Sequence, residues 1–229
     1  MATGTIIFRP SSDNSLNHSC SRGSQGYILI SDSSADDDST YIYQTVSSMY
    51  SSSETSSFIL TGTLPSEKIN VTAVRLYSRA KKSNSDLDAT YHCYFGVGTN
   101  AGGSSSNSGT SATLSQNYST INNDSQEMVT NINNYINSNN SFPTISVAIT
   151  TEGNLPDLKA NDGNIRVTQV YMEVDYETVE EENYIYIKEN GNWSTYSKVY
   201  KKINNSWIEQ TNLEEVFNSS TNYVKGEVQ

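Results

Sequence analysis

The longest alternating run of the chain is Ile165-Arg-Val-Thr-Gln-Val-Tyr-Met-Glu-Val-Asp-Tyr176. Successive side chains of a strand point to opposite sides, so Val170, Met172 and Val174 share one face. The residues between them are Tyr and Glu, which suit a solvated face. This pattern predicts a half-buried antiparallel strand whose apolar face lies on a core.

Several further short runs outside this stretch have strand character, and polar or Gly/Pro-containing segments separate them. They are 3–9, 27–30, 40–46, 57–64, 69–79, 89–97, 113–118 and 144–150. Pro10 and Pro65 are expected to end two of these strands, because proline cannot donate to a sheet ladder. So many short strands predict an all-β fold, an antiparallel β-sandwich of jelly-roll-like type.

One segment has helical periodicity instead. Met128, Ile132 and Ile136 recur at helical spacing. They follow Asp124-Ser-Gln-Glu127, which fits a capping box with Asp124 as the N-cap. The sequence therefore predicts one short helix over 125–137, which would cover an open end of the sandwich.

The C-terminal part contains a repeat. Tyr184-Ile-Tyr-Ile-Lys-Glu-Asn-Gly-Asn-Trp193 has a second copy fourteen positions further on. Tyr186, Lys188, Asn190 and Trp193 recur as Tyr200, Lys202, Asn204 and Trp207. Asn-Gly, and more weakly Asn-Asn, favour the positive φ angles of a two-residue hairpin turn. We therefore expect two small β-hairpins, each of which stacks a Trp on a neighbouring Tyr.

These patterns divide the chain into a β-sandwich domain over 1–177, a charged linker over 178–183 and a hairpin module over 184–229. A short capped helical turn is expected at 212–217, and the last dozen residues are expected to be mobile unless a partner holds them. A module this small rarely folds alone. It should therefore pack on the rest of the chain, on copies of itself or on a larger assembly. Its expected assembly contacts are Tyr186, Trp193, Tyr200, Trp207 and Phe217.

The second copy of the repeat also resembles a known module. Lys198-Val-Tyr-Lys-Lys-Ile-Asn-Asn-Ser-Trp-Ile-Glu-Gln-Thr-Asn-Leu213, followed by Val216-Phe217, is similar to a C-terminal module common in virion proteins of phages and prophages of Firmicutes-like bacteria. That module follows the pattern K-V-Y-K-K-[VI]-[ND]-[GN]-[ST]-W-[VI]-E-Q-[TS]-[DN]-L…F. The resemblance implies a phage structural protein and does not identify a reaction.

A looser resemblance covers residues 1–177. Phe58-Ile-Leu60, Leu64-Pro65 and Ile69-Asn-Val-Thr-Ala-Val-Arg-Leu-Tyr77 are similar to a segment of carbohydrate-binding-module-like sandwiches. The last strand of such domains is similar to 165–176. The resemblance implies a sandwich fold. Thr61 and Gly62 depart from the polar-acidic context usual after the Phe, so the family's ligand site does not carry over by motif.

Composition limits the classes of function. The chain of 229 residues has a formal net charge of −11, and no Lys/Arg cluster offsets it, so we expect no direct binding to nucleic acid. No run approaches the ~20 apolar residues of a membrane span. The N-terminus lacks the basic and apolar regions of a secretory signal peptide. A virion protein that assembles in the host cytoplasm and leaves by lysis would reconcile these features.

Few residues indicate chemistry. His18 and His92 match no metal-binding or nucleophile motif, so we expect a protein without enzymatic activity or cofactor. Cys20 and Cys93 could form one disulfide or remain thiols. Asp32, Asp36, Asp37 and Asp38 could bind a structural Ca²⁺, or form an ordinary solvated acidic loop.

Tyrosines supply the remaining site candidates. Tyr41, Tyr43 and Tyr77 fall on polar strand faces and could stack on sugar rings, or could line a sheet face or a subunit interface. Together these patterns favour a virion surface structural protein, either a capsid decoration or head-fibre component or a minor tail component. Its partners would be other virion proteins and further copies of itself. The alternative is a phage tail adhesin that recognises a host surface polysaccharide.

Overall fold

The structure is a computed structural model that describes residues 2–34, 39–47, 51–99, 108–155 and 162–179, and the backbone of 185–189, 192–203, 206–209 and 224–228. The chain forms two compact units, Met1–Val179 (unit 1) and Glu180–Gln229 (unit 2). The division falls inside the linker predicted over 178–183, whose first two residues, Thr178 and Val179, belong to unit 1. The N–H of Thr178 donates to the carbonyl of Ala2 (2.8 Å), and that of Val179 to the carbonyl of Lys68 (2.8 Å).

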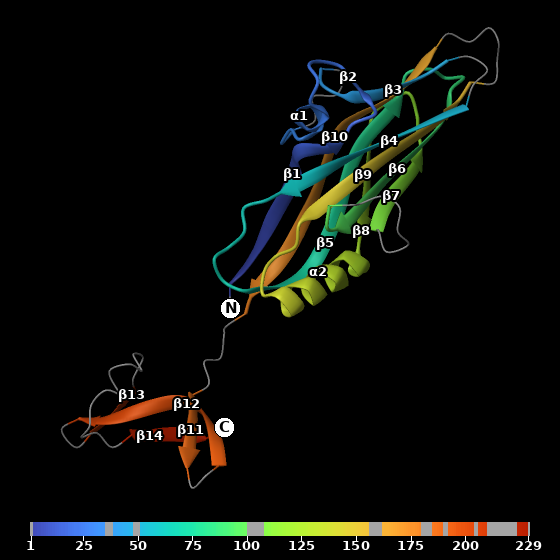
Figure 1. The fold of residues 1–229 in the computed structure, drawn as a ribbon. Helices are drawn as coiled ribbons and strands as arrows, with labels where there is room; N and C mark the ends of the chain where they lie inside the picture. Colours follow the sequence, from blue (N-terminus) through green and yellow to red (C-terminus); the bar gives the residue numbers. More distant parts are fainter. Residues whose placement is uncertain are drawn as a thin grey trace. The chain divides into compact units, whose positions relative to one another are not determined.

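Unit 1 is built almost entirely of antiparallel strands (Figure 1). The strands are β1 (Thr3–Ser15), β2 (Ser19–Cys20), β3 (Ile42–Val46), β4 (Ser51–Thr61), β5 (Ile69–Lys82), β6 (Asp88–Val97), β7 (Ser108–Thr113), β8 (Ser119–Asp124), β9 (Ile145–Asn154) and β10 (Gly163–Thr178). The helices are α1 (Gly26–Ile30) and α2 (Gln126–Asn139). The predicted all-β class is confirmed, and the described residues form two helices where one was expected.

The strand pairing follows the jelly-roll order. One layer runs β3-β10-β5-β8 and the other β4-β9-β6-β7. When β3 to β10 are numbered one to eight, the layers read 1-8-3-6 and 2-7-4-5, so successive strands mostly alternate between layers. This is the double-sheet jelly roll expected from the sequence. We call β3-β10-β5-β8 the first layer and β4-β9-β6-β7 the second layer.

Strand β1 belongs to both layers. Its first half pairs with β10, from Thr3 with Glu177 to Phe8 with Met172, and its second half pairs with β4 from Arg9 onward. The prediction that Pro10 ends this strand is wrong. Pro10 stands where the strand changes partner, beside a register shift, and such irregular edge positions tolerate the missing N–H.

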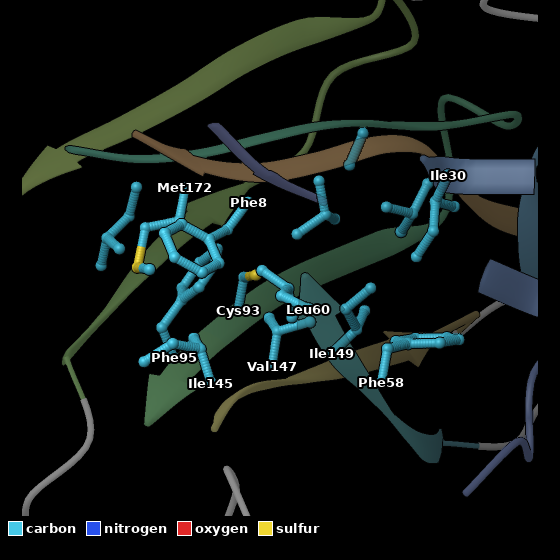
Figure 2. Packing of buried hydrophobic residues seen from close by; sticks show 14 of the residues in the cluster. Phe8, Ile30, Phe58, Leu60, Cys93, Phe95, Ile145, Val147, Ile149 and Met172 are labelled. Atoms are coloured by element: carbon cyan, nitrogen blue, oxygen red, sulfur yellow. The ribbon is translucent and has the colours of Figure 1, made fainter. Parts of the chain in front are cut away.

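A single hydrophobic core lies between the layers (Figure 2). Phe8 and Met172 contribute to it from the first layer, and Leu60, Cys93 and Phe95 from the second. The residues predicted to face inward on the long strand are all buried: Val170, Met172 and Val174. Strand alternation alone placed these side chains correctly, because one face of each layer packs on the core and the other faces solvent.

Helix α2 confirms the predicted helix, and its apolar stripe joins the core through Met128, Ile132 and Ile136. The N-cap is Ser125 and not Asp124: the Ser125 hydroxyl accepts the N–H of Met128 at 3.1 Å. Asp124 is the last residue of β8, where the ladder already fixes its backbone.

The strand predicted over 27–30 is wrong, because Gly26–Ile30 is the helix α1. The Asp13 carboxylate accepts the N–H groups of Gly26 (3.1 Å) and Tyr27 (2.7 Å), which holds the first turn. The strand predicted over 113–118 is also wrong, because only Thr113 is in a strand, as the last residue of β7, and 114–118 is the connection to β8. Short apolar runs do not distinguish the two element types, and β7 is a Ser/Thr-rich strand with little strand signal.

Unit 2 contains a four-stranded antiparallel sheet of β11 (Ile185–Glu189), β12 (Asn192–Ile203), β13 (Ser206–Glu209) and β14 (Val224–Val228). Strands β11 and β13 pair with successive halves of β12, and β14 pairs with its other edge. Two positions separate the paired ends of each hairpin, which confirms both predicted hairpins. Within the last dozen residues, expected to be mobile unless a partner holds them, Val224–Val228 forms β14. The turn predicted over 212–217 lies outside the described residues.

Candidate binding face on the first layer

The outer face of the first layer carries the unit's most distinctive surface chemistry. Outward positions alternate with the buried ones on β3, β5 and β10. Aromatic rings on or beside this face are Tyr43 of β3, Tyr41 directly before β3, Tyr77 of β5, Tyr171 of β10 and Tyr118 next to β8. We call this surface the tyrosine face.

Two of these rings pack against each other in the middle of the layer. Tyr77 and Tyr171 are cross-strand partners, and their rings are stacked with centroids 4.5 Å apart and planes 10° apart. That distance is close to the spacing of about 4.8 Å between neighbouring strands. The rings therefore stand on edge on the sheet, and each covers one face of the other.

Cations gather on the same face of an otherwise acidic chain. The structure describes eight Lys and Arg residues in unit 1, and five of them lie here. The guanidinium of Arg166 lies over the Tyr41 ring (4.7 Å), and that of Arg9 over the Tyr171 ring (5.0 Å). On the β8 side, Lys81 lies 4.5 Å and Arg79 5.6 Å from the Tyr118 ring. Such contacts hold long side chains in place and cover ring faces.

The fifth cation, Arg75, is paired with acids at the opposite end of the face. Its guanidinium donates to both carboxylate oxygens of Asp175 (2.6 and 2.8 Å) and to Glu173 (3.0 Å). The hydrogen bond from Arg75, and then one from Thr5, lower the pKa of Asp175. Burial, followed by the nearby Glu173 carboxylate, raises the pKa of Tyr77, whose hydroxyl donates to Glu173 at 3.3 Å.

The tyrosines predicted from the sequence all lie on this face, at two separate places. Tyr41 and Tyr43 contact each other edge to face, with centroids 5.8 Å apart, beside Arg166. Tyr77 stands further along the layer against Tyr171. The sequence prediction missed Tyr118 and the cations. Arg75, Arg79 and Lys81 alternate with buried residues along β5, and this pattern could have indicated three of the cations. Tyr118 lies outside the strands, and only the fold brings its ring to Lys81 and Arg79.

The predicted calcium loop is only partly described. Asp32 accepts a hydrogen bond from Thr40 at 3.3 Å, and its backbone carbonyl accepts from Arg9 (2.7 Å) and Gln169 (2.8 Å). Asp36, Asp37 and Asp38 lie outside the described residues. Within the described ranges, no group of three or more His, Cys, Asp or Glu side chains is placed to hold a metal ion.

A buried polar chain crosses the interior near the end of the sandwich. The His18 ring lies between the hydroxyls of Ser56 (Nδ1, 2.7 Å) and Thr151 (Nε2, 2.8 Å). Thr151 donates to Gln44 (2.7 Å), whose amide donates to Ser52 (2.9 Å). His18 is 3% exposed, and burial lowers its pKa to about 4.

The backbone fixes the direction of this chain. Ser56 Oγ accepts the N–H groups of Asn17 (2.9 Å) and His18 (3.0 Å), so its own hydrogen is left to donate to the ring. Nδ1 of His18 is then an acceptor, and Nε2 carries the proton that is donated to Thr151. This satisfied network is a structural feature of the interior.

The two cysteines are both free thiols, Cys93 in the core and Cys20 partly exposed. Burial raises the pKa of Cys93 to about 12, which keeps this thiol protonated. His92 points outward and stacks on Tyr94 with centroids 5.9 Å apart, so the neighbouring His and Cys lie on opposite faces of β6.

A shallow cavity of about 440 Å³ lies over the second layer, where β4 and β6 begin and β9 ends. Its polar lining includes the carboxylates of Asp88 and Glu152 and the hydroxyls of Ser51, Ser53 and Thr90. Two carboxylates on open strand ends do not form a metal or acid/base constellation by themselves.

In unit 2 the sequence repeat appears as a repeated cross-strand register. Lys188 pairs with Trp193 in the first hairpin, and Lys202 pairs with Trp207 in the second. Tyr186 and Tyr200 stand two positions before these lysines, opposite Thr195 and Glu209. The predicted Trp–Tyr stacking concerns side chains that the structure does not describe, and Phe217 lies outside the described residues.

No protein-family model matches the chain, and no curated protein matches it. Two solved structures, of the Gt and Gx strains of infectious bursal disease virus, align with TM-scores of 0.24 and 0.25 at 9% sequence identity. They cover 77% and 78% of this chain, which spans 60% of each of theirs. Similarity at this level carries no argument about function. No helix among the described residues is long and apolar enough to cross a membrane.

Proposed function

We propose that this chain is a non-enzymatic surface component of a bacteriophage virion, a capsid decoration or head-fibre component or a minor tail component. In this proposal unit 2 attaches the protein to the particle and unit 1 is displayed. The jelly roll supports it only as a class, because viral capsid proteins, lectins and cupins share that architecture.

The observation that carries the proposal is the repeated register of unit 2. Two copies of a fourteen-residue motif form two hairpins with the same Lys–Trp pair. A repeated Trp and Tyr at matching register positions suits contact with a partner, because aromatic residues dominate binding energy at interfaces. The phage-module resemblance of the second copy supplies the partner class, which is other virion proteins.

Particle binding by the full-length protein tests the proposal. Particles assembled without the protein would be mixed with purified wild type or with Trp193→Ala/Trp207→Ala, and pelleted protein would be measured. We expect the wild type to sediment with the particles and the double variant to lose at least tenfold in affinity. A Tyr41→Ala/Tyr43→Ala variant is the matched control and should bind normally. Failure of the wild type to sediment with any particle fraction would contradict the proposal.

The second candidate function is a tail adhesin for a host surface polysaccharide, favoured by the tyrosine face. Tyr41 and Tyr43 are half-buried neighbours on an outward strand face. Tyr77 is less suited to stack on a sugar, because Tyr171 covers one of its ring faces. Glycan-array binding that disappears in Tyr41→Ala/Tyr43→Ala would favour this candidate. Unchanged host adsorption by that variant would remove it.

A further inference from the structure

We propose that two copies of this chain pair through their tyrosine faces. Charge is distributed unevenly along the first layer. Arg166, Lys81 and Arg79 lie toward one end, where β10 begins and β5 ends. Glu173 and Asp175 lie toward the other end.

The acidic half includes two further residues. Asp124 of β8 pairs with Arg75, next to Glu173 on the outer face, and Glu177 of β10 pairs with Asn70. This half therefore holds four carboxylates and one guanidinium. In the opposite half, none of the described outward strand positions is acidic. The face is positive at one end and negative at the other, with Tyr77 and Tyr171 between them.

Such a face is complementary to itself under a two-fold rotation. Consider an axis parallel to the layer and at right angles to its strands, at the level of the Tyr77–Tyr171 pair. Rotation about it stacks two layers with reversed strand directions and places the positive half of each copy over the negative half of the other. Arg166 of each copy then lies over Asp175 of the other, and the tyrosine pairs meet at the centre. An isologous dimer requires this kind of self-complementarity.

The size and composition of the face also fit. At a strand spacing of about 4.8 Å and a rise of about 3.3 Å per residue, β3, β10, β5 and β8 give roughly 650 Å² per copy. The first half of β1 adds about 100 Å², which brings the face close to the ~800 Å² per partner of a stable interface. Tyr and Arg are the residues enriched at interfaces. Ile7 of β1 adds an exposed apolar side chain (44%) beside Glu173. A sugar stacks on the open face of an aromatic ring. Tyr77 and Arg9 cover the ring of Tyr171, and Arg166 lies over the ring of Tyr41, so these rings suit a flat protein partner better than a sugar.

The test is sedimentation equilibrium of the full-length protein at low and high salt. We expect a dimer that dissociates at least tenfold more readily in 0.5 M salt than in 0.05 M, because opposite charges meet across it. Arg79→Glu/Lys81→Glu should weaken the dimer at least tenfold. The control, Thr55→Glu/His92→Glu, adds two negative charges on the outer face of the second layer and should leave the dimer intact.

A second variant guards against misfolding of the first. Ile7→Glu alters only an exposed side chain and should also weaken the dimer at least tenfold, with far-UV circular dichroism unchanged. A wild type that stays monomeric up to 100 μM would overturn the proposal, as would glycan binding by a monomer that needs Arg79 and Lys81. A dimer lost in Trp193→Ala/Trp207→Ala but intact in Arg79→Glu/Lys81→Glu would assign self-association to unit 2 and overturn it too. Particle binding by unit 2 is measured separately, so the two proposals fail independently.

Discussion

His18 is held neutral by its surroundings at every contact. Its Nδ1 can only accept from Ser56, whose two acceptor positions are taken by backbone N–H groups. Protonation at Nδ1 would set two donors against each other inside a region closed to water. This geometry and the lowered pKa of about 4 agree in direction.

The first prediction concerns pH. The folded-state pKa of His18, about 4, lies below the 6.5 of an ordinary histidine, so the unfolded state takes up this proton first. The contribution of His18 to the free energy of unfolding is fully present above pH 6.5. It is lost as the pH falls from 6.5 to 4, and the total loss is at most about 3 kcal/mol. Urea unfolding across this window should show a smaller pH slope for His18→Gln than for wild type. Equal slopes would contradict the assignment.

The second prediction concerns Thr151, the next member of the chain. It accepts from His18 and donates to Gln44, so Thr151→Val leaves two buried polar groups unpaired. We expect a loss of about 2–3 kcal/mol in the free energy of unfolding. Thr150→Val, the neighbour on the exposed face, should change it by less than about 0.5 kcal/mol. Similar losses from both variants would show that the buried chain contributes little.

At this scale, sequence reasoning found the faces of residues but not their partners. Alternation placed Tyr41 and Tyr43 outward and Met172 inward, because it depends only on the strand period. The contact of His18 with Thr151 joins positions 133 residues apart, and that of Arg166 with Tyr41 depends on the register of β3 against β10. No local pattern encodes such pairings.

Among the elements, helix α2 gives the sharpest test of a corrected prediction. Ser125 caps the helix through its hydroxyl, whereas the sequence pattern favoured Asp124. Ser125→Ala should destabilise unit 1 by about 1 kcal/mol in denaturant unfolding, the usual cost of a lost cap. Asp124→Ala should cost less than about 0.5 kcal/mol. The reverse ranking would restore Asp124 as the N-cap.

Elements with long periodic patterns were predicted well, and short ones were not. Strands β5 and β10 and helix α2 were recognised because many residues repeat one period. Gly26–Ile30 became a helix because the Asp13 carboxylate, from a distant strand, satisfies its first N–H groups. Its apolar run, Tyr27–Ile30, is too short to show a helical or a strand period, so hydrophobicity could not decide between them.

For the whole molecule, the two units should unfold separately. Both tryptophans of the chain, Trp193 and Trp207, belong to unit 2, whereas most of the strand content belongs to unit 1. Denaturant unfolding followed by tryptophan fluorescence should therefore have a lower midpoint than unfolding followed by far-UV circular dichroism. Coincident curves would mean that the two units unfold as one cooperative body.

The jelly-roll order was predicted as a class from the number and spacing of strands. The division of β1 between two layers was not predicted, because a proline such as Pro10 within an apolar run predicts the end of a strand. The charge separation along the tyrosine face was also beyond sequence reasoning. It arises when β5 and β10 run antiparallel and bring the start of one beside the end of the other.

The placement of β1 has a mechanical consequence. Its first residues pair with the last residues of β10, so unit 1 begins and ends side by side: the N–H of Ala2 donates to the Thr178 hydroxyl at 2.8 Å. Tension applied between the N-terminus and Val179 would load these bonds one after another, as in a zipper, instead of all at once in shear. A single-molecule pulling experiment should therefore peel β1 away at low force before the remaining sandwich yields.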